Sequence, residues 1–573
     1  MKKSHQSIFS DKRLKENLDV LAQVDPVMAQ RLSWPVDNLH IRIKKANTSE
    51  EIAQILYRDT WQDLEPINLA CSSQSLADEI SFFANKKKGS NILLFGVGIG
   101  GYAEALLTFL PVNSIIHIFD QDPWMLRLFL MRLDIRKELS TGRCRIYLGT
   151  DLVKLRQRRE SLHIFWHPVL KKIYHNERAF FMEKDFSNKK LAILIGEGTL
   201  FVDDVADVLR RMGHDVFPWF PVRISIEEAA YQIVSFRPNA VFNINYLHGL
   251  APFVARHGSK FICWEIDPIV DRLDKNSMPE QENIFIFTYN PNYVETYLAA
   301  GFKQVEYLPL ASNTSRRRPT ELTPDLYKKY KTPVSFVGAS MKTQAEELKS
   351  LFLKIPSHYF NGKDACTVFH KTVEAQLHDM DTYRVPEILS SYLSPGQEPI
   401  FSFRGSTYEI PMLIAETLAM HHRLQTVTRL GTYGIDVWGD RGWKDIVDRG
   451  VHYRGPAGHT QEINYIYKAS DVNIDINRIF QKQIVTMRVF DVLACEGFII
   501  AEHNKSLKEL FDIDREVISY RNNEELYYKV GYFLSHPEER HKIARAGRKA
   551  VEQRHDIKHR ITYILKEAGL GQF

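Results

Sequence analysis

The amino-acid sequence predicts an α/β protein with parallel sheets. Short apolar segments of strand length alternate with helical patterns in three successive series, which begin near residues 91, 191 and 334. Strands that are apolar along their whole length are typical of parallel sheets covered by helices on both faces. With 573 residues, the chain is also too long for a single hydrophobic core. We therefore expect several α/β domains.

Two connectors divide the chain into three predicted domains. Residues 1 to about 85 read as helical and polar, with an amphipathic run over residues 50–57, and precede the first strand series. The charged connector 183–190 separates the first series from the second, and a polar, proline-containing linker over residues 313–324 separates the second from the third. The predicted domains are residues 1–185, 186–318 and 319–573.

The strand pattern within the series makes specific predictions. In the first domain we expect a βαβ unit in which residues 91–95 and 114–120 are strands. In the third domain we expect a strand at 334–337, a helical block over 344–393, a helix over 410–421, a strand at 424–427 and a strand around 472–476.

Bulk composition is that of an ordinary folded protein, with 44% hydrophobic and 25% charged residues. The 75 Lys and Arg residues nearly balance the 70 Asp and Glu residues, which argues against nucleic acid as a partner and leaves sugar phosphates or anionic lipid open. The five cysteines form no CxxC pair, so a reducing compartment is expected. No apolar run reaches the ~18 residues of a membrane span, and no apolar signal core follows the first residues. We expect a cytoplasmic location with, at most, peripheral membrane contact.

A glycine motif opens the first strand series. Gly96, Gly98 and Gly101 follow a strand in the pattern GxGxxG and lead into a helix, and Asp120 closes the next strand about 20 residues later. Glycines let a ligand approach the N–H groups at a helix N-terminus, and an acid at this place can accept ribose hydroxyls. The motif resembles the first half of a dinucleotide- or S-adenosylmethionine-binding fold, although Leu94 stands where methyltransferases usually carry an acid. Two interpretations stay open: a ligand loop, or a Rossmann-like domain with a structural role only.

Asp120 and Asp122 also fit the DxD pattern of metal-binding glycosyltransferases. That pattern alone has little specificity, and the Rossmann interpretation already accounts for Asp120. We therefore expect no metal site.

The most informative segment of the third domain is residues 488–502. It reads as a helix, a glycine turn at Gly497 and a buried strand. Arg488 and Asp491 are three residues apart, so they share one face of the helix. A guanidinium can bind a diphosphate and a carboxylate can accept ribose hydroxyls, so the pair predicts a nucleotide-sugar site. Arg488 is also predicted to stabilise the charge that grows on a leaving diphosphate.

Several motifs support the same interpretation. Residues 474–478, with Ile476-Asn477, are similar to a "leucine-asparagine" strand, and residues 488–491 with 494–497 are similar to an "arginine-x-phenylalanine-glutamate … alanine-cysteine-glycine" signature. These motifs resemble those of GT-B glycosyltransferases, in particular the bacterial spore-maturation-type, group 1-like family, over about residues 190–570. The resemblance implies two Rossmann-like domains around a cleft and a last helix that crosses back onto the central domain. The first strand series adds an extra N-terminal Rossmann-like domain.

The chain departs from the family pattern at three positions. Asp491 stands where the family has glutamate, Gln483 where the wider retaining class has a second carboxylate, and Glu496 where glycine is common. An aspartate can still accept two ribose hydroxyls. The missing acid at Gln483 keeps open a non-catalytic, glycan-binding scaffold with a degenerate site.

The resemblance also implies where the two substrates bind. The donor-side residues follow strands of the third domain, where open α/β sheets bind ligands: Gly338, Ser340 and Lys342 at the phosphates, Trp438, Gly439, Tyr453 and Arg454 near the base, together with Asp491 and Glu496. On the acceptor side, His248 is the predicted general base, because an ordinary pKa of ~6.5 suits proton transfer near neutral pH. Glu265 and Asp267 end another strand and are predicted to compete for that role or to bind sugar hydroxyls.

The sequence therefore predicts a hexosyltransferase-like GT-B enzyme that moves a sugar from a nucleotide-diphosphate sugar to a hydroxyl acceptor. Fixed cations and helix N-termini can replace a metal, so no metal or other cofactor is expected. The first domain resembles accessory domains of bacterial glycosyltransferases that modify flagellin or surface glycans, which favours a protein or surface-glycan acceptor. The alternatives are an S-adenosylmethionine-dependent or bifunctional enzyme that uses the Gly96 loop, and the non-catalytic scaffold. The donor sugar, its base and the stereochemistry stay open.

Overall fold

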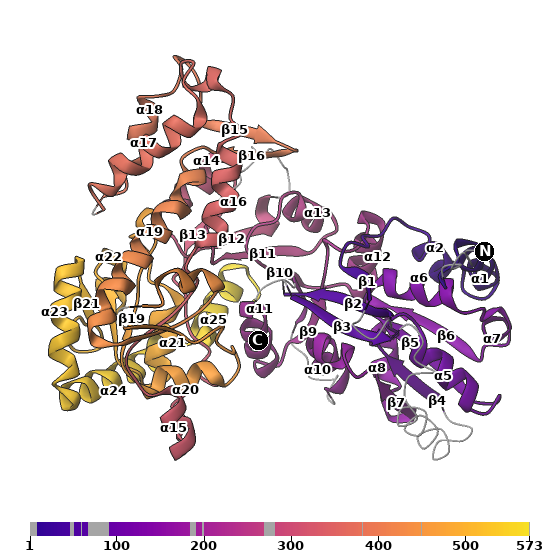
Figure 1. Cartoon of the computed structure of the whole chain (residues 1–573). Coiled ribbons are helices and arrows are strands. Elements are labelled where there is room, and N and C mark those ends of the chain that lie inside the picture. The colour runs from indigo at the N-terminus through magenta and orange to yellow at the C-terminus, as the bar shows by residue number, and fades with distance from the viewer. Residues whose placement is uncertain are drawn as a thin grey trace, which may run out of the picture. The chain divides into compact units, whose positions relative to one another are not determined.

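The computed structural model describes residues 8–45, 51–58, 60–66, 91–183, 191–196, 200–268, 281–380, 382–448 and 450–571 (Figure 1). The chain forms two compact units. The first contains Met1–Ile244 and Ala251–Phe261, and the second contains Asn245–Leu250 and Ile262–Phe573. The sheets of the α/β series are parallel, which confirms the predicted fold class. The domain boundaries near residues 185 and 318 stay predictions.

The first unit begins with two capped helices, α1 (Asp11–Val24) and α2 (Pro26–Arg31). The side chains of Ser10 and Asp25 each accept a hydrogen bond from a backbone N–H of the first turn. An antiparallel sheet in the order β1-β2-β3 follows, formed by β1 (Ile41–Lys45), β2 (Glu51–Tyr57) and β3 (Thr60–Pro66). The helical reading of residues 50–57 is wrong, because β2 pairs on both sides and its backbone groups serve the sheet.

A parallel sheet in the order β6-β5-β4-β7 forms the core of the first unit. Its strands are β4 (Asn91–Phe95), β5 (Ile115–Asp120), β6 (Cys144–Leu148) and β7 (Leu162–Trp166). The connecting helices are α5 (Gly101–Phe109), α6 (Pro123–Arg132), α7 (Arg136–Ser140), α8 (Leu152–Gln157), α9 (Leu170–Ile173) and α10 (His175–Met182). The predicted βαβ unit is confirmed, since β4 and β5 pair in parallel on either side of α5.

A second α/β series completes the first unit. The parallel strands β8 (Ala192–Gly196), β9 (Asp215–Trp219) and β10 (Ala240–Ile244) lie in the order β10-β8-β9. The helices of this series are α11 (Leu200–Arg211), α12 (Ile226–Phe236) and α13 (Leu250–Arg256). The division between the units falls within β11 (Lys260–Glu265).

The second unit continues with β12 (Ile284–Thr288), α14 (Asn292–Ala299) and β13 (Gln304–Tyr307), in which β12 and β13 pair in parallel. Its larger sheet runs in the order β18-β17-β14-β19-β20-β21. The strands are β14 (Thr332–Val337), β17 (Ile435–Trp438), β18 (Val451–Tyr453), β19 (Ser470–Ile474), β20 (Ile499–Glu502) and β21 (Ile518–Tyr520). Strand order runs outward in both directions from the pair β14–β19.

The third series also contributes helices to the second unit. They are α15 (Pro324–Tyr330), α16 (Lys342–Phe352), α19 (Met412–Leu430), α20 (Glu462–Ala469), α21 (Met487–Ala494), α22 (Lys505–Leu510), α23 (Asn523–Leu534), α24 (Pro537–Arg554) and α25 (Ile557–Glu567). The predicted strand at residues 424–427 is wrong, because these residues lie inside α19. Val427 and Leu430 are buried there, so a four-residue apolar run belongs to the inner face of a long helix rather than to a strand.

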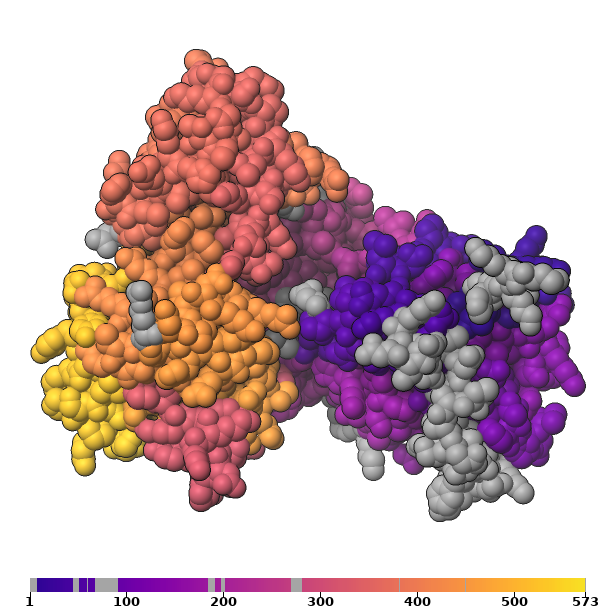
Figure 2. All heavy atoms as spheres, viewed as in Figure 1, coloured from indigo at the N-terminus to yellow at the C-terminus, as the bar shows by residue number. Residues whose placement is uncertain are grey.

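An insertion between α16 and α19 builds a small core of its own. It contains η4 (Ser357–Phe360), α17 (Ala365–Leu377), α18 (Val385–Ser390) and the hairpin β15 (Ile400–Phe403) with β16 (Ser406–Glu409). Phe360, Phe369 and Phe401 are buried within it. In Figure 2 its salmon-coloured atoms stand out from the rest of this unit. The helical reading of residues 344–393 holds for α16 to α18, whereas the sequence reading missed the hairpin.

The last helix, α25, contacts the segment that follows β13. Arg560 Nε donates to the Pro309 carbonyl over 2.9 Å, and Ser312 exchanges backbone hydrogen bonds with His555 and Ile557. Among the described residues, no helix is both long and apolar enough to span a bilayer. The same residues include no cluster of three or more His, Cys, Asp or Glu side chains arranged to hold a metal ion.

Candidate functional site

The site lies at the carboxyl ends of two neighbouring parallel strands of the second unit. β14 ends at Val337 and β19 ends at Ile474, and the strand order changes direction between them. At such a switch point, the loops that leave the two strands diverge to opposite faces of the sheet, and open α/β sheets bind their ligands between them. The side chains gathered at this edge therefore define what the site can hold.

Arg488, at the start of α21, reaches across to the end of β14. Its Nε donates to the Val337 carbonyl over 2.7 Å, and its guanidinium carbon lies 4.5 Å from the centre of the Phe336 ring. It also forms an ion pair with Asp475, which follows β19 and accepts a 2.6 Å hydrogen bond from Thr486. Contacts with both strands fix the guanidinium at the switch point.

Arg478 comes from the loop that follows β19. Its Nε lies 3.1 Å from Glu416 Oε1 on α19, and its Nη1 donates to Gln481 Oε1 over 3.3 Å. Gln481 in turn donates to the hydroxyl of Tyr289, directly after β12. Through this chain of contacts the end of β12 meets the end of β19.

Arg423, from the inner face of α19, is the most deeply buried cation of the group, with 6% of its surface exposed. Its guanidinium donates to two backbone carbonyls, Ala339 over 2.8 Å and Ile476 over 3.4 Å. Its Nε has no partner among the described residues. Burial, reinforced by the charges of Arg478 and Arg488, lowers the pKa of Arg423 to about 9.

The three arginines exceed the carboxylates that face them. Arg478 is paired with Glu416 and Arg488 with Asp475, whereas Arg423 forms no ion pair within the described part of the chain. One buried positive charge is left without a counter-charge. A buried cation is costly unless an anion accompanies it, so this edge of the sheet is chemically suited to a phosphate or diphosphate.

The backbone of the first strand end is closely packed against β17. A Cβ atom on Gly439 would lie 2.1 Å from the Gly338 carbonyl oxygen, so only glycine fits there. Ser340 is fully buried, and Asp440 accepts hydrogen bonds from both its hydroxyl (2.6 Å) and its backbone N–H (2.8 Å). Lys342 is partly exposed and lies 2.5 Å from Asp445. Gly338 and Lys342 are thus at the site edge, while the Ser340 hydroxyl serves the loop itself.

The predicted base-binding residues lie further along the same edge. Trp438 is buried in the core beneath the sheet, so only its backbone reaches the edge. The Tyr453 hydroxyl donates to the Gly439 carbonyl over 3.2 Å. Arg454 is half-exposed, and its Nε donates to Asp436 over 2.7 Å. Tyr453 and Arg454 therefore lie at the end of β18, which is two strands away from β14.

Asp491 does not face Arg488. Its carboxylate accepts hydrogen bonds from Ser312 Oγ at 2.6 Å and from Arg317 Nε at 3.2 Å, and 8% of the residue is exposed. Ser312 directly precedes the linker over residues 313–324, and Arg317 lies within it. The side chain is therefore engaged with the linker, and its predicted role at the ribose stays a prediction.

Glu496 lies at the opposite end of α21 from Arg488, about 12 Å along the helix axis. It adopts a left-handed φ of +56° and forms a 3.0 Å ion pair with Lys468. Gly497 N–H donates to the Val492 carbonyl and Glu496 N–H to the Leu493 carbonyl, the hydrogen-bond pattern of a Schellman motif. The left-handed position is thus Glu496 rather than Gly497.

The acceptor-side residues come from the end of β11 and the preceding loop. Glu265 is buried and accepts hydrogen bonds from Tyr246 N–H (2.5 Å) and the Tyr297 hydroxyl (2.6 Å). Burial raises its pKa to about 7. Asp267 is exposed and accepts a 2.8 Å hydrogen bond from Asn245. His248 is also exposed, and its ring lies 5.6 Å from that of Tyr246.

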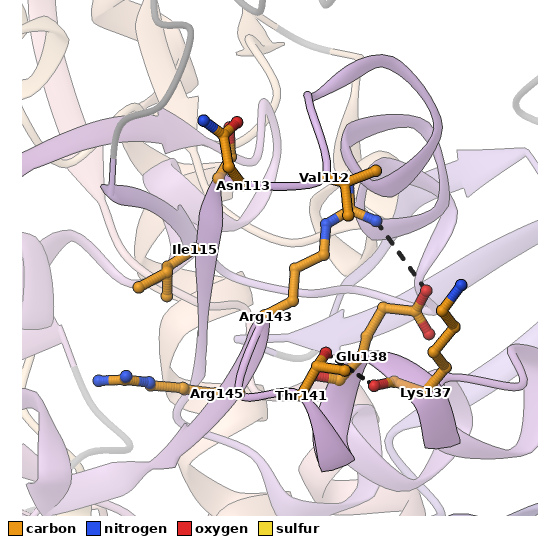
Figure 3. Close-up of a pocket in the computed structure, with 10 residues that line it drawn as sticks. Val112, Asn113, Ile115, Lys137, Glu138, Thr141, Arg143 and Arg145 are labelled. Carbon is orange, nitrogen blue, oxygen red and sulfur yellow. Dashed lines mark hydrogen bonds and ion pairs between the residues drawn. The ribbon is translucent and has the colours of Figure 1, made fainter.

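The glycine loop lies in the first unit. Gly96, Gly98 and Gly101 connect β4 to α5 as predicted, and Asp120 ends β5 fully buried. Burial raises the pKa of Asp120 to about 7, and the neighbouring Asp122 adds to the effect. A cavity of about 330 Å³ in this unit lies where β5 and β6 begin, around Ile115 and Arg143 (Figure 3). None of the predicted site residues lines this cavity.

The sequence reading missed Arg423, Arg478, Glu416 and Asp475. Arg478 and Asp475 stand within the recognised 474–478 motif but received no role. Arg423 lies four residues after buried Ala419 and four before buried Val427, so helical spacing places it on the inner face of α19. That signal could be used only if the helix was known to continue beyond residue 421.

A family model described as glycosyl transferase-like matches residues 420–566. This part of the chain is similar to glycosyl transferase-like domains. The matched range contains Arg423, Arg478 and Arg488, the three cations of the switch point. The predicted resemblance to glycosyltransferases is confirmed, while the spore-maturation-type branch stays a prediction. No curated protein matches the chain.

Solved structures are similar to about two thirds or more of the chain. A glycosyltransferase from Rickettsia africae is 12% identical, with 83% of this chain and 98% of that chain covered and a TM-score of 0.35. HepE of Anabaena in complex with UDP-glucose is 10% identical, with coverages of 66% and 99% and a TM-score of 0.38. A trehalose-6-phosphate structure from E. coli bound with UDP-2-fluoro glucose is 10% identical, with coverages of 67% and 99% and a TM-score of 0.34.

Proposed function

We propose that the protein is a glycosyltransferase that transfers a sugar from a nucleotide-diphosphate sugar to a hydroxyl acceptor. The observation that carries the proposal is the buried positive charge of Arg423 beside Arg478 and Arg488, at the switch point of a glycosyl transferase-like domain. A bound anion compensates that charge, and the donor's diphosphate is the anion that this class of reaction brings to the site.

In the proposed reaction, the bond between the anomeric carbon and the diphosphate oxygen breaks while a bond to the acceptor oxygen forms. Arg488 and Arg423 stabilise the negative charge that accumulates on the leaving diphosphate, because their guanidinium groups are already fixed by backbone carbonyls. Gly338 and Lys342 stand beside them at the phosphate end. Fixed cations supply this charge, so the proposal includes no metal and no other cofactor.

The acceptor hydroxyl loses its proton to a base. His248 and Asp267 are exposed at the end of β11 and the preceding loop, and the proposal assigns the base to one of them. Glu265 is assigned a positioning role, because its carboxylate already holds the backbone of Tyr246 and the hydroxyl of Tyr297. The nucleoside is assigned to Trp438, Gly439, Tyr453 and Arg454, and the ribose to Asp491. Glu496 is assigned no direct contact with the donor.

The proposed acceptor is a protein or a surface glycan, because the N-terminal domain resembles accessory domains of bacterial glycosyltransferases that modify such acceptors. The proposed location of the reaction is the cytoplasm. A hexose is the proposed transferred group. These assignments are tested by product analysis once a donor has been found.

The test is a thermal-shift and hydrolysis screen of nucleotide diphosphates and nucleotide sugars with the full chain and two variants, Arg488→Met and Arg423→Met. We expect one donor to raise the melting temperature and each variant to weaken its binding roughly 10- to 100-fold, because each removes a charge-assisted contact. Activity is expected to persist in EDTA. No shift with any donor would favour the scaffold alternative.

Arg540→Met is the matched control. Arg540 is also buried and pairs with Asp471 over 2.8 Å, but Asp471 lies at the amino end of β19, away from the switch point. We expect the control to lose stability as the other two variants do and to keep the affinity for the donor. Equal loss of affinity in all three variants would contradict the assignment of the arginine cluster.

A further inference from the structure

The glycine loop of the first unit is already filled by the chain's own side chains. Glu65 is the penultimate residue of β3. Its carboxylate extends to the N-terminus of α5, and the side chain is fully buried. Ile99 N–H donates to Glu65 Oε1 over 2.9 Å and Gly101 N–H donates to the same oxygen over 3.2 Å. These are the N–H groups that a cofactor phosphate uses in a dinucleotide-binding loop.

The second oxygen of Glu65 is held by a histidine in a defined tautomer. The backbone N–H groups of Val169 and Leu170 both donate to His167 Nδ1 over 3.2 Å, so Nδ1 is an acceptor. The proton of the neutral ring therefore lies on Nε2, which is 3.3 Å from Glu65 Oε2 and donates to it. The Glu65 carboxylate thus receives three N–H donors, as a bound anion would.

The ribose position of the loop is equally occupied. Asp120 accepts hydrogen bonds from Val97 N–H (2.7 Å), Asp122 N–H (3.0 Å) and the Tyr174 hydroxyl (2.7 Å). It is fully buried, so no part of its carboxylate faces solvent. Both groups that would recognise a dinucleotide are committed within the protein.

The loop also lacks space for a second anion. A Cβ atom on Gly98 would lie 2.7 Å from His167 Nε2 and 3.2 Å from the Glu65 carboxyl carbon.

An irregularity in the antiparallel sheet orients Glu65. The register of β2 and β3 shifts between Ala53 and Gln54, opposite the end of β3, and Leu64 and Glu65 are both buried although they are consecutive. A regular strand would turn one of them outward, so the irregularity aims Glu65 at the loop.

We propose that Glu65 is the resident ligand of the glycine loop: this carboxylate site holds β3 against α5 and is closed to dinucleotides and S-adenosylmethionine. The antiparallel sheet β1-β2-β3 thereby takes the place of a cofactor. This inference concerns the first unit and does not depend on the proposed sugar transfer.

The test uses Glu65→Ala in the full chain, with formate as a small carboxylate probe. We expect the substitution to lower the melting temperature by roughly 5–10 °C, because it leaves three buried N–H donors without an acceptor. Formate is expected to restore much of the loss in this variant and to leave the wild type unchanged. The control is Glu160→Ala, which removes a carboxylate that is 90% exposed. We expect this control to keep the melting temperature of the wild type, with or without formate.

The wild-type chain provides a second test that needs no variant to fold. Titration with S-adenosylmethionine, NAD⁺ and NADP⁺ is expected to give no heat and no thermal shift. Binding of any of these three ligands would overturn the proposal. Unchanged stability of Glu65→Ala, or stability that formate does not restore, would overturn it as well.

Discussion

Replacing Asp491 by Asn separates two roles for this residue, at the ribose and at the linker. The substitution keeps the shape of the side chain and removes the charge that faces Arg317, which is 7% exposed beside an Asp491 that is 8% exposed. It also replaces one acceptor oxygen by an NH₂ group, which can only donate, so the side chain no longer accepts from both Ser312 and Arg317. Arg317 then stays buried without its carboxylate.

The expected cost follows from these contacts. Removing one partner of a fully buried pair costs about 3–5 kcal/mol, and a hydrogen bond to a charged group is worth about 1.5–3 kcal/mol. Because the Asp491 side chain is slightly exposed and the Arg317 contact is long at 3.2 Å, we expect about 2–3 kcal/mol for Asp491→Asn.

A double-mutant cycle with Arg317→Met in urea unfolding provides the assay. We expect a coupling energy of about 1–2 kcal/mol between the two positions. If the two substitutions add independently, the linker role is refuted. A ribose role predicts instead a raised KM for the donor with little change in stability, and the same variants report that in the transfer assay.

Two further predictions concern single side chains. Glu496→Gly is expected to stabilise the chain by about 0.5–1 kcal/mol, since glycine adopts the left-handed φ of +56° without strain. The control is Lys468→Ala, which removes only the half-exposed ion pair with Glu496. A lower melting temperature for Glu496→Gly would contradict this prediction. For Glu265, burial raises the pKa from 4.5 to about 7, so the folded state holds the proton more tightly and stability falls as the pH rises from about 4.5 to 7. Glu265→Gln is expected to remove up to about 3 kcal/mol of this dependence in urea unfolding at several pH values, and an unchanged pH profile would show that the group titrates normally.

The local pattern of the sequence was sufficient for the main elements and for the class of the second unit. The βαβ unit after residue 91, the linker after residue 312 and the helix of Arg488 were all read from apolar runs, glycines and charges. These features are local, because periodicity and capping depend on residues within a few positions of each other. The glycosyltransferase resemblance rested on the same kind of short motif, and the motifs at residues 474–478 and 488–497 lie within the matched range.

Errors arose where local preference and tertiary packing compete. Residues 424–427 are apolar enough for a strand, but packing places Val427 on the buried face of a helix that starts at Met412. Residues 50–57 have an amphipathic pattern that fits either structure, and pairing with β1 and β3 decided for a strand. The sequence alone does not reveal a partner that is distant along the chain.

The partners of charged side chains were decided by tertiary structure alone. By itself the sequence placed Arg488 and Asp491 on one helical face, and it placed three glycines before a helix. Only the fold pairs Arg488 with Asp475, engages Asp491 with Arg317 and turns Glu65 into the ligand of the glycine loop. The physical reason is that a buried charge must find an opposite charge or a donor wherever the chain brings one near, and that proximity depends on the packing of the whole unit rather than on spacing in the sequence.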